Sequence, residues 1–238
     1  MNHLVFRAAG ERFHSRLDWL NSWHSFSFAS HHDPHWMGFG PLRVINDDTI
    51  AAGRGFGMHP HRDMEIITVM VEGEISHRDS LGHAEVLRAG EVQHMSAGTG
   101  VVHSEINEGT APCRLLQIWI EPSRVGIPPT YGQKPFTIGA GWTALLDPAG
   151  REGALAIQRP VRLWRAQPPA GGELPLPLAA GCQGWIQMVA GSACLTGGGE
   201  SLALRRGDGL GFSAGPAEPP VRLGAGAGGA DLLLFELR

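Results

Sequence analysis

Three histidines and one glutamate in the first half of the chain have the types and the spacing of metal ligands. His59 and His61 are two residues apart, and so are His103 and Glu105. Residues two apart in a β-strand point to the same face, so each pair can project into the interior of a β-barrel. Neutral imidazoles and a carboxylate suit a transition metal, whereas calcium prefers oxygen ligands throughout. We therefore predict one divalent transition metal at these four residues.

The alternative for any single histidine is an ordinary polar place in a strand. Two same-face pairs near Gly-rich turns outweigh that alternative, because the segment between them is predicted to form a hairpin that brings the pairs together. Three imidazoles and one carboxylate around an octahedral ion leave two positions open. Such positions suit either a substrate oxygen together with dioxygen or a substrate that chelates through two oxygens, so the open site favours catalysis.

Other residues have weaker claims on this site. Glu65 is expected on the same strand face as the histidine pair, where it would support a ligand without binding the metal. His94 is either a core histidine or a hydrogen-bond partner of a ligand or substrate. Phe39, Met58 and Trp119 are candidates for the apolar walls of a pocket, or simply for the core.

The elements that must position these residues are short strands. Glycine (34 residues) and proline (17 residues) are abundant while 42% of the chain is apolar, and helical periodicity is scarce. We predict an all-β fold, and the clearest of the predicted strands are Leu42 to Asn46, Glu65 to Val71, Leu115 to Ile120, Gly184 to Val189 and Asp231 to Glu236. The segment Ile127 to Gly132, with two adjacent prolines, is expected to connect two halves.

An internal echo indicates two barrels of one design. The segment Val71 to Gly98 aligns with Val189 to Gly215 with one gap. The paired residues include Gly73 with Gly191, Gly90 with Gly207, Glu91 with Asp208, and Ser96-Ala97-Gly98 with Ser213-Ala214-Gly215. We predict tandem domains at residues 1–130 and 131–238.

The same alignment predicts only one metal site. The residues opposite His59, His61, His103 and Glu105 are Pro177, Ala179, Pro220 and Arg222. None of them is a plausible metal ligand in that role, so the C-terminal domain is expected to lack metal ligands.

Composition limits the partners and the compartment. The net charge is −4 and the pI is near 6.3, so the basic surface needed to neutralise a phosphate backbone is missing and direct nucleic-acid binding is not expected. Cys113, Cys182 and Cys194 are odd in number and far apart, which fits a reducing cytoplasm. Neither a signal peptide nor a membrane span is recognisable, so we expect a cytoplasmic protein without membrane contact.

Two short motifs and four longer segments carry a family resemblance. G-x5-H-x-H at Gly53 to His61 and G-x2-H-x3-N at Gly100 to Asn107 look like the two cupin motifs. More specifically, four segments resemble the pirin family: SFSFASHHDPHWMGFGPLRVINDD (25–48), HPHRDMEIITVMVEGEISHRDSLG (59–82), HMSAGTGVVHSEIN (94–107) and LLQIWIEP (115–122).

The resemblance implies two tandem cupin barrels, double-stranded β-helix or jelly-roll domains, with metal in the first and none in the second. His59, His61, His103 and Glu105 match the family's ligands, and iron(II) is favoured over zinc, manganese, nickel or copper. The implied activity is that of a mononuclear non-haem dioxygenase, similar to quercetin 2,3-dioxygenase, acting on a small flavonol-type aromatic with dioxygen. Glu105 would also be the catalytic base.

Two alternatives belong to other classes. One is an iron-binding, redox-sensing module that regulates a protein partner, as the family resemblance also implies. The other is a zinc hydrolase, since three histidines and a metal-bound water can produce a nucleophile near neutral pH. Glu105 argues against the hydrolase, because catalytic zinc usually keeps three protein ligands.

Overall fold

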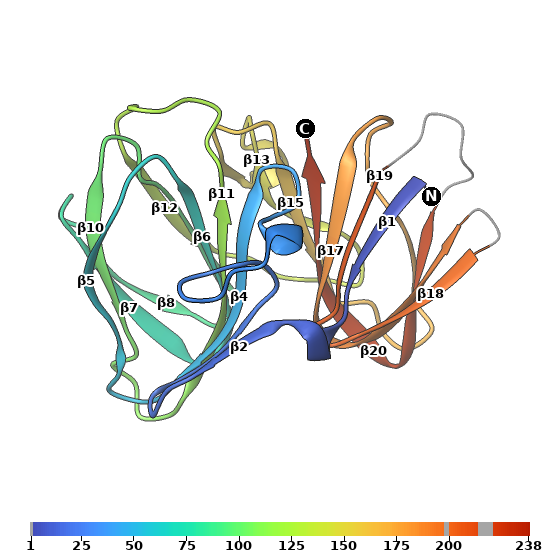
Figure 1. Cartoon of the computed structure of the whole chain (residues 1–238), viewed down its shortest axis with the longest axis horizontal. Coiled ribbons are helices and arrows are strands. Elements are labelled where there is room, and N and C mark those ends of the chain that lie inside the picture. Colours follow the sequence, from blue (N-terminus) through green and yellow to red (C-terminus); the bar gives the residue numbers. More distant parts are fainter. Residues whose placement is uncertain (1, 198–199, 214–220) are drawn as a thin grey trace. The chain divides into compact units, whose positions relative to one another are not determined.

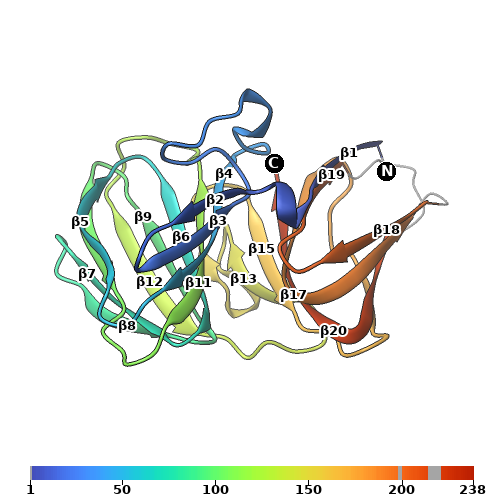
Figure 2. The same ribbon diagram turned by 60° about the horizontal axis from the view of Figure 1, so that its bottom comes forward.

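The protein folds almost entirely as β-strands. A computed structural model describes residues 2–197, 200–213 and 221–238, of which the helical part consists of three single 3-10 turns, Ala9–Glu11, Pro34–Trp36 and Arg151–Gly153. In the part of the chain so described, no helix has the length and apolarity that crossing a membrane requires. Figures 1 and 2 show the strands from two directions. The predicted all-β class is confirmed.

The strands belong to two compact units. We call residues 13–136 and 157–159 the N-terminal barrel, and the described parts of residues 2–12, 137–156 and 160–238 the C-terminal barrel. The division predicted from the sequence differs in three respects, one of which is that residues 157–159 belong to the N-terminal barrel. The N-terminal barrel continues through residue 136, beyond the predicted end at residue 130, and the first strand of the chain belongs to the C-terminal barrel.

The N-terminal barrel contains a seven-stranded and a four-stranded sheet. The larger sheet has the order β12-β9-β6-β11-β4-β3-β2 and the smaller one β5-β10-β7-β8. The strands are β2 (Phe13–Arg16), β3 (Leu20–His24), β4 (Leu42–Ile50), β5 (Gly55–His61), β6 (Glu65–Glu72), β7 (Glu74–Asp79), β8 (Ala84–Arg88), β9 (Glu91–Ser96), β10 (Val101–Ile106), β11 (Cys113–Ile120) and β12 (Thr130–Pro135). β12 begins inside the segment that was expected to be a connection.

A row of buried polar side chains crosses the larger sheet. Register pairs join Asn46 to His24 and to Gln117, and Gln117 to Thr68, which in turn pairs with Gln93. All five side chains are buried. Because paired residues share a face, this polar row lies on one face of the sheet, the face that Gln117 and Asn46 present to a cavity.

The C-terminal barrel is built on a nine-stranded sheet. Its strands are β1 (Asn2–Arg7), β13 (Thr143–Asp147), β14 (Leu155–Ala156), β15 (Arg162–Ala166), β16 (Glu173–Pro175), β17 (Gln183–Gly197), β18 (Glu200–Arg205), β19 (Gly209–Ser213) and β20 (Arg222–Leu237). β1 pairs antiparallel with β19. Figure 1 shows β1 beside β19, whereas the next strand of the chain, β2, belongs to the seven-stranded sheet of the N-terminal barrel. The core is apolar and includes Ile186, Leu210, Phe212 and Leu234.

The internal echo has a structural counterpart in the turns of the two barrels. Gly73 and Gly191 have φ values of 73° and 68°, and Gly90 and Gly207 have φ values of 86° and 88°. Such left-handed conformations favour glycine. The amide of Gly90 donates to the carbonyl of Met70 at 3.3 Å, and that of Gly207 to Met188 at 3.0 Å. The aligned residues Ala214, Gly215 and Pro220 lie outside the described residues.

A buried ion pair occupies the same place in both barrels with its charges exchanged. In the alignment of the echo, Asp47 corresponds to Arg165 and Arg114 to Asp231. Arg114 Nε lies 2.8 Å from Asp47 Oδ1, and Arg165 Nη2 lies 2.6 Å from Asp231 Oδ2. Both arginines bind their carboxylate through two nitrogens. The duplicated scaffold has therefore kept the pair and reversed its polarity.

Candidate metal centre

The smaller sheet of the N-terminal barrel brings three histidines together. β5 pairs antiparallel with β10, and His103 stands directly opposite His59. The ring centroid of His59 lies 4.4 Å from that of His103 and 4.8 Å from that of His61, and His61 and His103 are 4.9 Å apart. One ring nitrogen of each histidine lies within 4.8 Å of those of the other two. No other described group of histidine, cysteine or acidic residues clusters in this way.

Hydrogen bonds at Nδ1 leave Nε2 of two of these rings available. His59 Nδ1 donates to the carbonyl of Gly57 at 2.8 Å, so His59 Nε2 carries the lone pair. His103 Nδ1 lies 3.4 Å from His77 Nδ1. His103 Nε2 is buried, and within the described residues it has no hydrogen-bond partner. A buried nitrogen without a partner is rare, and a metal ion among three imidazoles would satisfy it.

The cluster favours uncharged imidazoles. Burial and the neighbouring His59 lower the pKa of His61 to about 4. Burial, His59 and His61 lower the pKa of His103 to about 3. Both rings are therefore neutral at pH 7, with lone pairs free to coordinate a cation. The donor set fits a divalent transition metal.

Glu105 lies on the same strand as His103 but is held by other contacts. A register shift between His103 and Glu105 places Glu105 opposite Phe56. Gln117 Nε2 donates to both carboxylate oxygens, at 3.0 and 2.9 Å. The single hydroxyl proton of Thr68 is shared between Glu105 Oε1 at 3.3 Å and Gln117 Oε1 at 3.2 Å. Burial raises the pKa of Glu105. The structure thus fixes the orientation of this carboxylate through Gln117 and Thr68.

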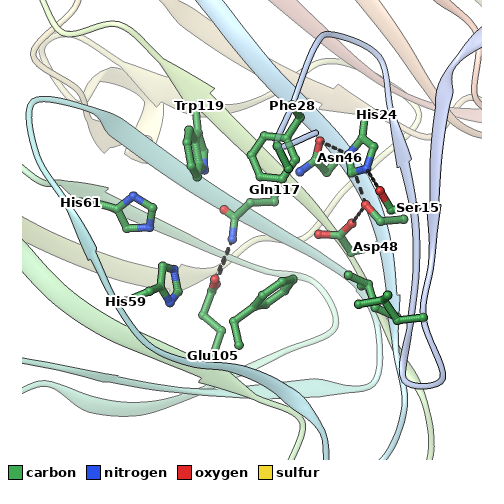
Figure 3. A pocket seen from close by; sticks show the side chains of 15 residues that line it. Ser15, His24, Phe28, Asn46, Asp48, His59, His61, Glu105, Gln117 and Trp119 are labelled. Carbon is green, nitrogen blue, oxygen red and sulfur yellow. Dashed lines mark hydrogen bonds between the residues drawn. The ribbon is translucent and has the colours of Figure 1, made fainter. Parts of the chain in front are cut away.

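A cavity of about 320 Å³ opens beside the histidines, and its lining includes His59, His61 and Glu105. Figure 3 shows His59 and His61 on one side of it and His24, Asn46 and Asp48 on the other. Trp119 packs edge-on against His61 at 5.0 Å and against Phe28 at 5.4 Å. The remaining lining residues are Ser15, Leu17, Leu20, Ser22, Ala29, Phe56 and Gln117. The cavity is large enough for a small aromatic ligand.

The structure places only some of the weaker candidates beside the cavity. Trp119 lines the cavity as expected, whereas Phe39 and Met58 are not among its lining residues.

Glu65 is on β6, in the other sheet from His59 and His61, so the expectation of a shared strand face was wrong. Its Oε2 lies 2.6 Å from His94 Nε2, and Ser96 donates to Oε1. Glu65 and His94 therefore form a buried pair with each other.

Sequence reasoning missed Gln117, Thr68, His77 and Asp79. Gln117 had a signal, because it is the one amide in the apolar run LLQIWI, where a polar residue needs a buried partner. His77 and Asp79 are two residues apart, the same spacing as the ligand pairs. What these residues contact depends on strand register, which spacing alone does not give.

The fold and the histidine cluster define a bicupin, a protein of two tandem cupin barrels. A family model described as Pirin matches residues 5–120, and one described as the quercetinase C-terminal cupin domain matches residues 144–237. Over 195 residues the chain is 46% identical to quercetin 2,3-dioxygenase of Escherichia coli K12, covering 82% of this chain and 84% of that protein. The chain belongs to the pirin family.

Solved structures agree with this assignment. YhhW from Escherichia coli superposes with a TM-score of 0.92 at 41% identity, over 99% of this chain and 98% of that one. The bacterial pirin YhhW in complex with nickel(II) superposes with a TM-score of 0.91 at 42% identity, over 99% of both chains. A pirin-like protein of Caulobacter vibrioides is 40% identical over 204 residues, covering 82% of this chain and 84% of that protein.

Proposed function

We propose that this chain is a metal-dependent dioxygenase that cleaves a flavonol-type aromatic. His59, His61, His103 and Glu105 are the proposed ligands of one divalent transition metal, with iron(II) as the ion for catalysis. The observation that carries the proposal is the buried, unpartnered Nε2 of His103, which lies beside the imidazoles of His59 and His61. The family relatives named quercetin 2,3-dioxygenase and the nickel(II) complex of YhhW support it.

The cavity supplies the other requirements of the reaction. When bound, the metal would hold a substrate oxygen and dioxygen together and stabilise negative charge that develops on the substrate. Trp119, Phe28 and Phe56 give the cavity aromatic walls that receive a flat ring system and exclude water. A flavonol that enters with its hydroxyl towards the histidines would meet these walls along its length.

Glu105 is the proposed base. Its carboxylate is buried and oriented by Gln117 and Thr68, and burial raises its pKa, so it can take the hydroxyl proton of the substrate onto a carboxylate oxygen. Glu105→Gln should retain at least part of its metal through the three histidines and lose turnover. A Glu105→Gln enzyme that holds metal and turns over at the full rate would exclude this role.

Carbon monoxide release and oxygen uptake test the activity. Protein reconstituted anaerobically with iron(II) is given quercetin in air, with His61→Ala as the variant and His32→Ala, at an exposed histidine outside the cluster, as the matched control. Release by the wild type, with one dioxygen consumed per carbon monoxide, and none by His61→Ala is expected. A wild type that binds one equivalent of iron firmly and releases none would reject quercetin-type cleavage and keep the metal centre.

A further inference from the structure

The end of the cavity away from the histidines is polar. Two cross-strand pairs of β3 and β4 form it, Ser22 with Asp48 and His24 with Asn46. All four side chains are buried, and all four line the cavity. Figure 3 shows His24, Asn46 and Asp48 across the cavity from His59 and His61. We call Ser22, His24, Asn46 and Asp48 the distal cluster.

Internal hydrogen bonds hold the distal cluster in place. Ser22 Oγ donates to Asp48 Oδ1. His24 Nδ1 lies 2.7 Å from Asn46 Oδ1, while His24 Nε2 lies 2.9 Å from Ser15 Oγ. Ser15 Oγ is in turn 3.0 Å from a ring nitrogen of His31. These contacts use one of the two carboxyl oxygens of Asp48 and the amide oxygen of Asn46, and they restrict the rotamers of both side chains.

Two polar atoms remain available to a ligand. Within the described residues, Asn46 Nδ2 and Asp48 Oδ2 have no hydrogen-bond partner, although each residue is only 3% exposed. Both atoms belong to side chains that line the cavity, so a ligand that enters it can form hydrogen bonds with them. They lie two residues apart on β4 and offer one amide donor beside one carboxyl oxygen.

The cavity therefore has three parts: imidazoles at one end, aromatic and aliphatic walls in the middle, and the distal cluster at the other end. Such a lining is complementary to a flat ring system with polar groups at both ends. We propose that Asn46 and Asp48 form a second binding subsite, which takes the hydroxyl groups on the ring of the ligand that lies away from the metal. The preferred substrates are then polyhydroxylated aromatics. This inference rests on the proposed function and specifies its substrate class.

Anaerobic binding separates this subsite from the metal centre. Dissociation constants for quercetin and for 3-hydroxyflavone, which keeps the metal-chelating oxygens and lacks the other hydroxyls, are measured on nickel(II)-loaded protein. The wild type is expected to bind quercetin at least about tenfold more tightly, as one or two buried hydrogen bonds would give. In Asn46→Leu, quercetin should bind about tenfold more weakly while 3-hydroxyflavone binds as before.

A second variant tests the subsite without leaving a buried hydrogen-bond partner unpaired, in case Asn46→Leu fails to fold. Ser22→Ala/Asp48→Val removes both partners of one hydrogen bond, so neither is left buried and unpaired. It should also lose the preference for quercetin. Gln93→Leu is the matched control, because Gln93 lies in the same buried polar row but does not line the cavity. Thermal unfolding and nickel content verify each variant.

The outcomes distinguish this inference from the proposed function. The subsite would be overturned if the wild type bound the two flavonols with equal affinity, or if the variants lost equal affinity for both. Carbon monoxide release by the wild type would still support the dioxygenase. A wild type that binds neither flavonol with nickel in place would overturn both. Loss of the quercetin preference in the two cavity variants, with the preference intact in Gln93→Leu, would establish the subsite.

Discussion

The Nδ1 atom of His103 lies 3.4 Å from the Nδ1 atom of His77 in the interior of the N-terminal barrel. His77 Nε2 lies 3.2 Å from Asp79 Oδ2, and Asp79 also accepts hydrogen bonds from the backbone amides of Leu81 and His83. If His77 donates from Nε2 to the carboxylate, its Nδ1 accepts the proton of His103 Nδ1. The chain of contacts then directs the lone pair of His103 Nε2 towards the other two histidines.

Removing the acceptor at residue 77 should weaken metal binding. His77→Phe leaves His103 Nδ1 without its partner, so the ring orientation and tautomer are no longer fixed. We expect the affinity for the metal to fall about 10- to 100-fold. Competition with a chelator measures the affinity, and the visible spectrum of the cobalt(II)-loaded protein reports the coordination geometry.

His77→Gln is the matched variant, since its side-chain oxygen can accept the same proton. It should recover most of the affinity and the cobalt(II) spectrum of the wild type. If His77→Phe binds metal as tightly as the wild type with an unchanged spectrum, His77 does not position His103.

Substitution of Gln117 should lower the turnover rate more than it lowers the metal content of the protein. Gln117→Leu removes the donor to both oxygens of Glu105 and leaves only Thr68. We expect kcat to fall about tenfold, in line with the loss of a hydrogen bond to a charged group, while metal content at saturation is unchanged. Thr68→Val, which removes the longer contact, should have a smaller effect. The reverse order of the two variants would reject this assignment.

Asp48 makes the metal-free protein less stable at higher pH. Burial raises the pKa of Asp48 to about 7, partly offset by the hydrogen bond from Ser22. Between about pH 4 and 7 the folded state holds a proton that the unfolded chain has already released, so the free energy of unfolding falls as pH rises through this range. The full effect is on the order of 4 kcal/mol at pH 8.

Asp48→Asn keeps an acceptor for Ser22 and removes the titration. Urea unfolding of both proteins without metal, at pH 4.5 and pH 8, should show a variant that gains stability relative to the wild type as pH rises. Parallel pH profiles of the two proteins would contradict a raised pKa at Asp48.

Reversing the buried ion pair of the N-terminal barrel should be tolerated only as a double change. Arg114→Asp or Asp47→Arg alone places like charges together in a buried site and should cost about 3–5 kcal/mol of unfolding free energy. Asp47→Arg/Arg114→Asp reproduces the polarity found at Arg165 and Asp231 and should recover most of this loss. Chemical denaturation measures all three variants. A double variant as unstable as the single ones would show that the two barrels differ at this place in more than polarity.

The sequence predicted the elements whose signals are local. Strands such as Leu115 to Ile120 are apolar runs, and the spacing of His59 with His61 already places both side chains on one face. β1 was missed because its partner β19 lies some two hundred residues away, and no local pattern encodes such a pairing. Glu65 was placed with the histidine pair, yet Asp63, with a φ of 48°, interrupts the chain between β5 and β6. The distal cluster depends on the register of β3 and β4, which residue spacing within either strand does not reveal.

The exchanged polarity of the two buried ion pairs also bears on how a duplicated chain folds. Tandem copies of one design are prone to domain swapping, in which a strand of one copy enters the sheet of the other. Here β4 paired with β20 would bury Asp47 beside Asp231, and β15 paired with β11 would bury Arg165 beside Arg114. Either error would confine two like charges at low dielectric, so we expect each barrel to reject the equivalent strand of its sister during folding.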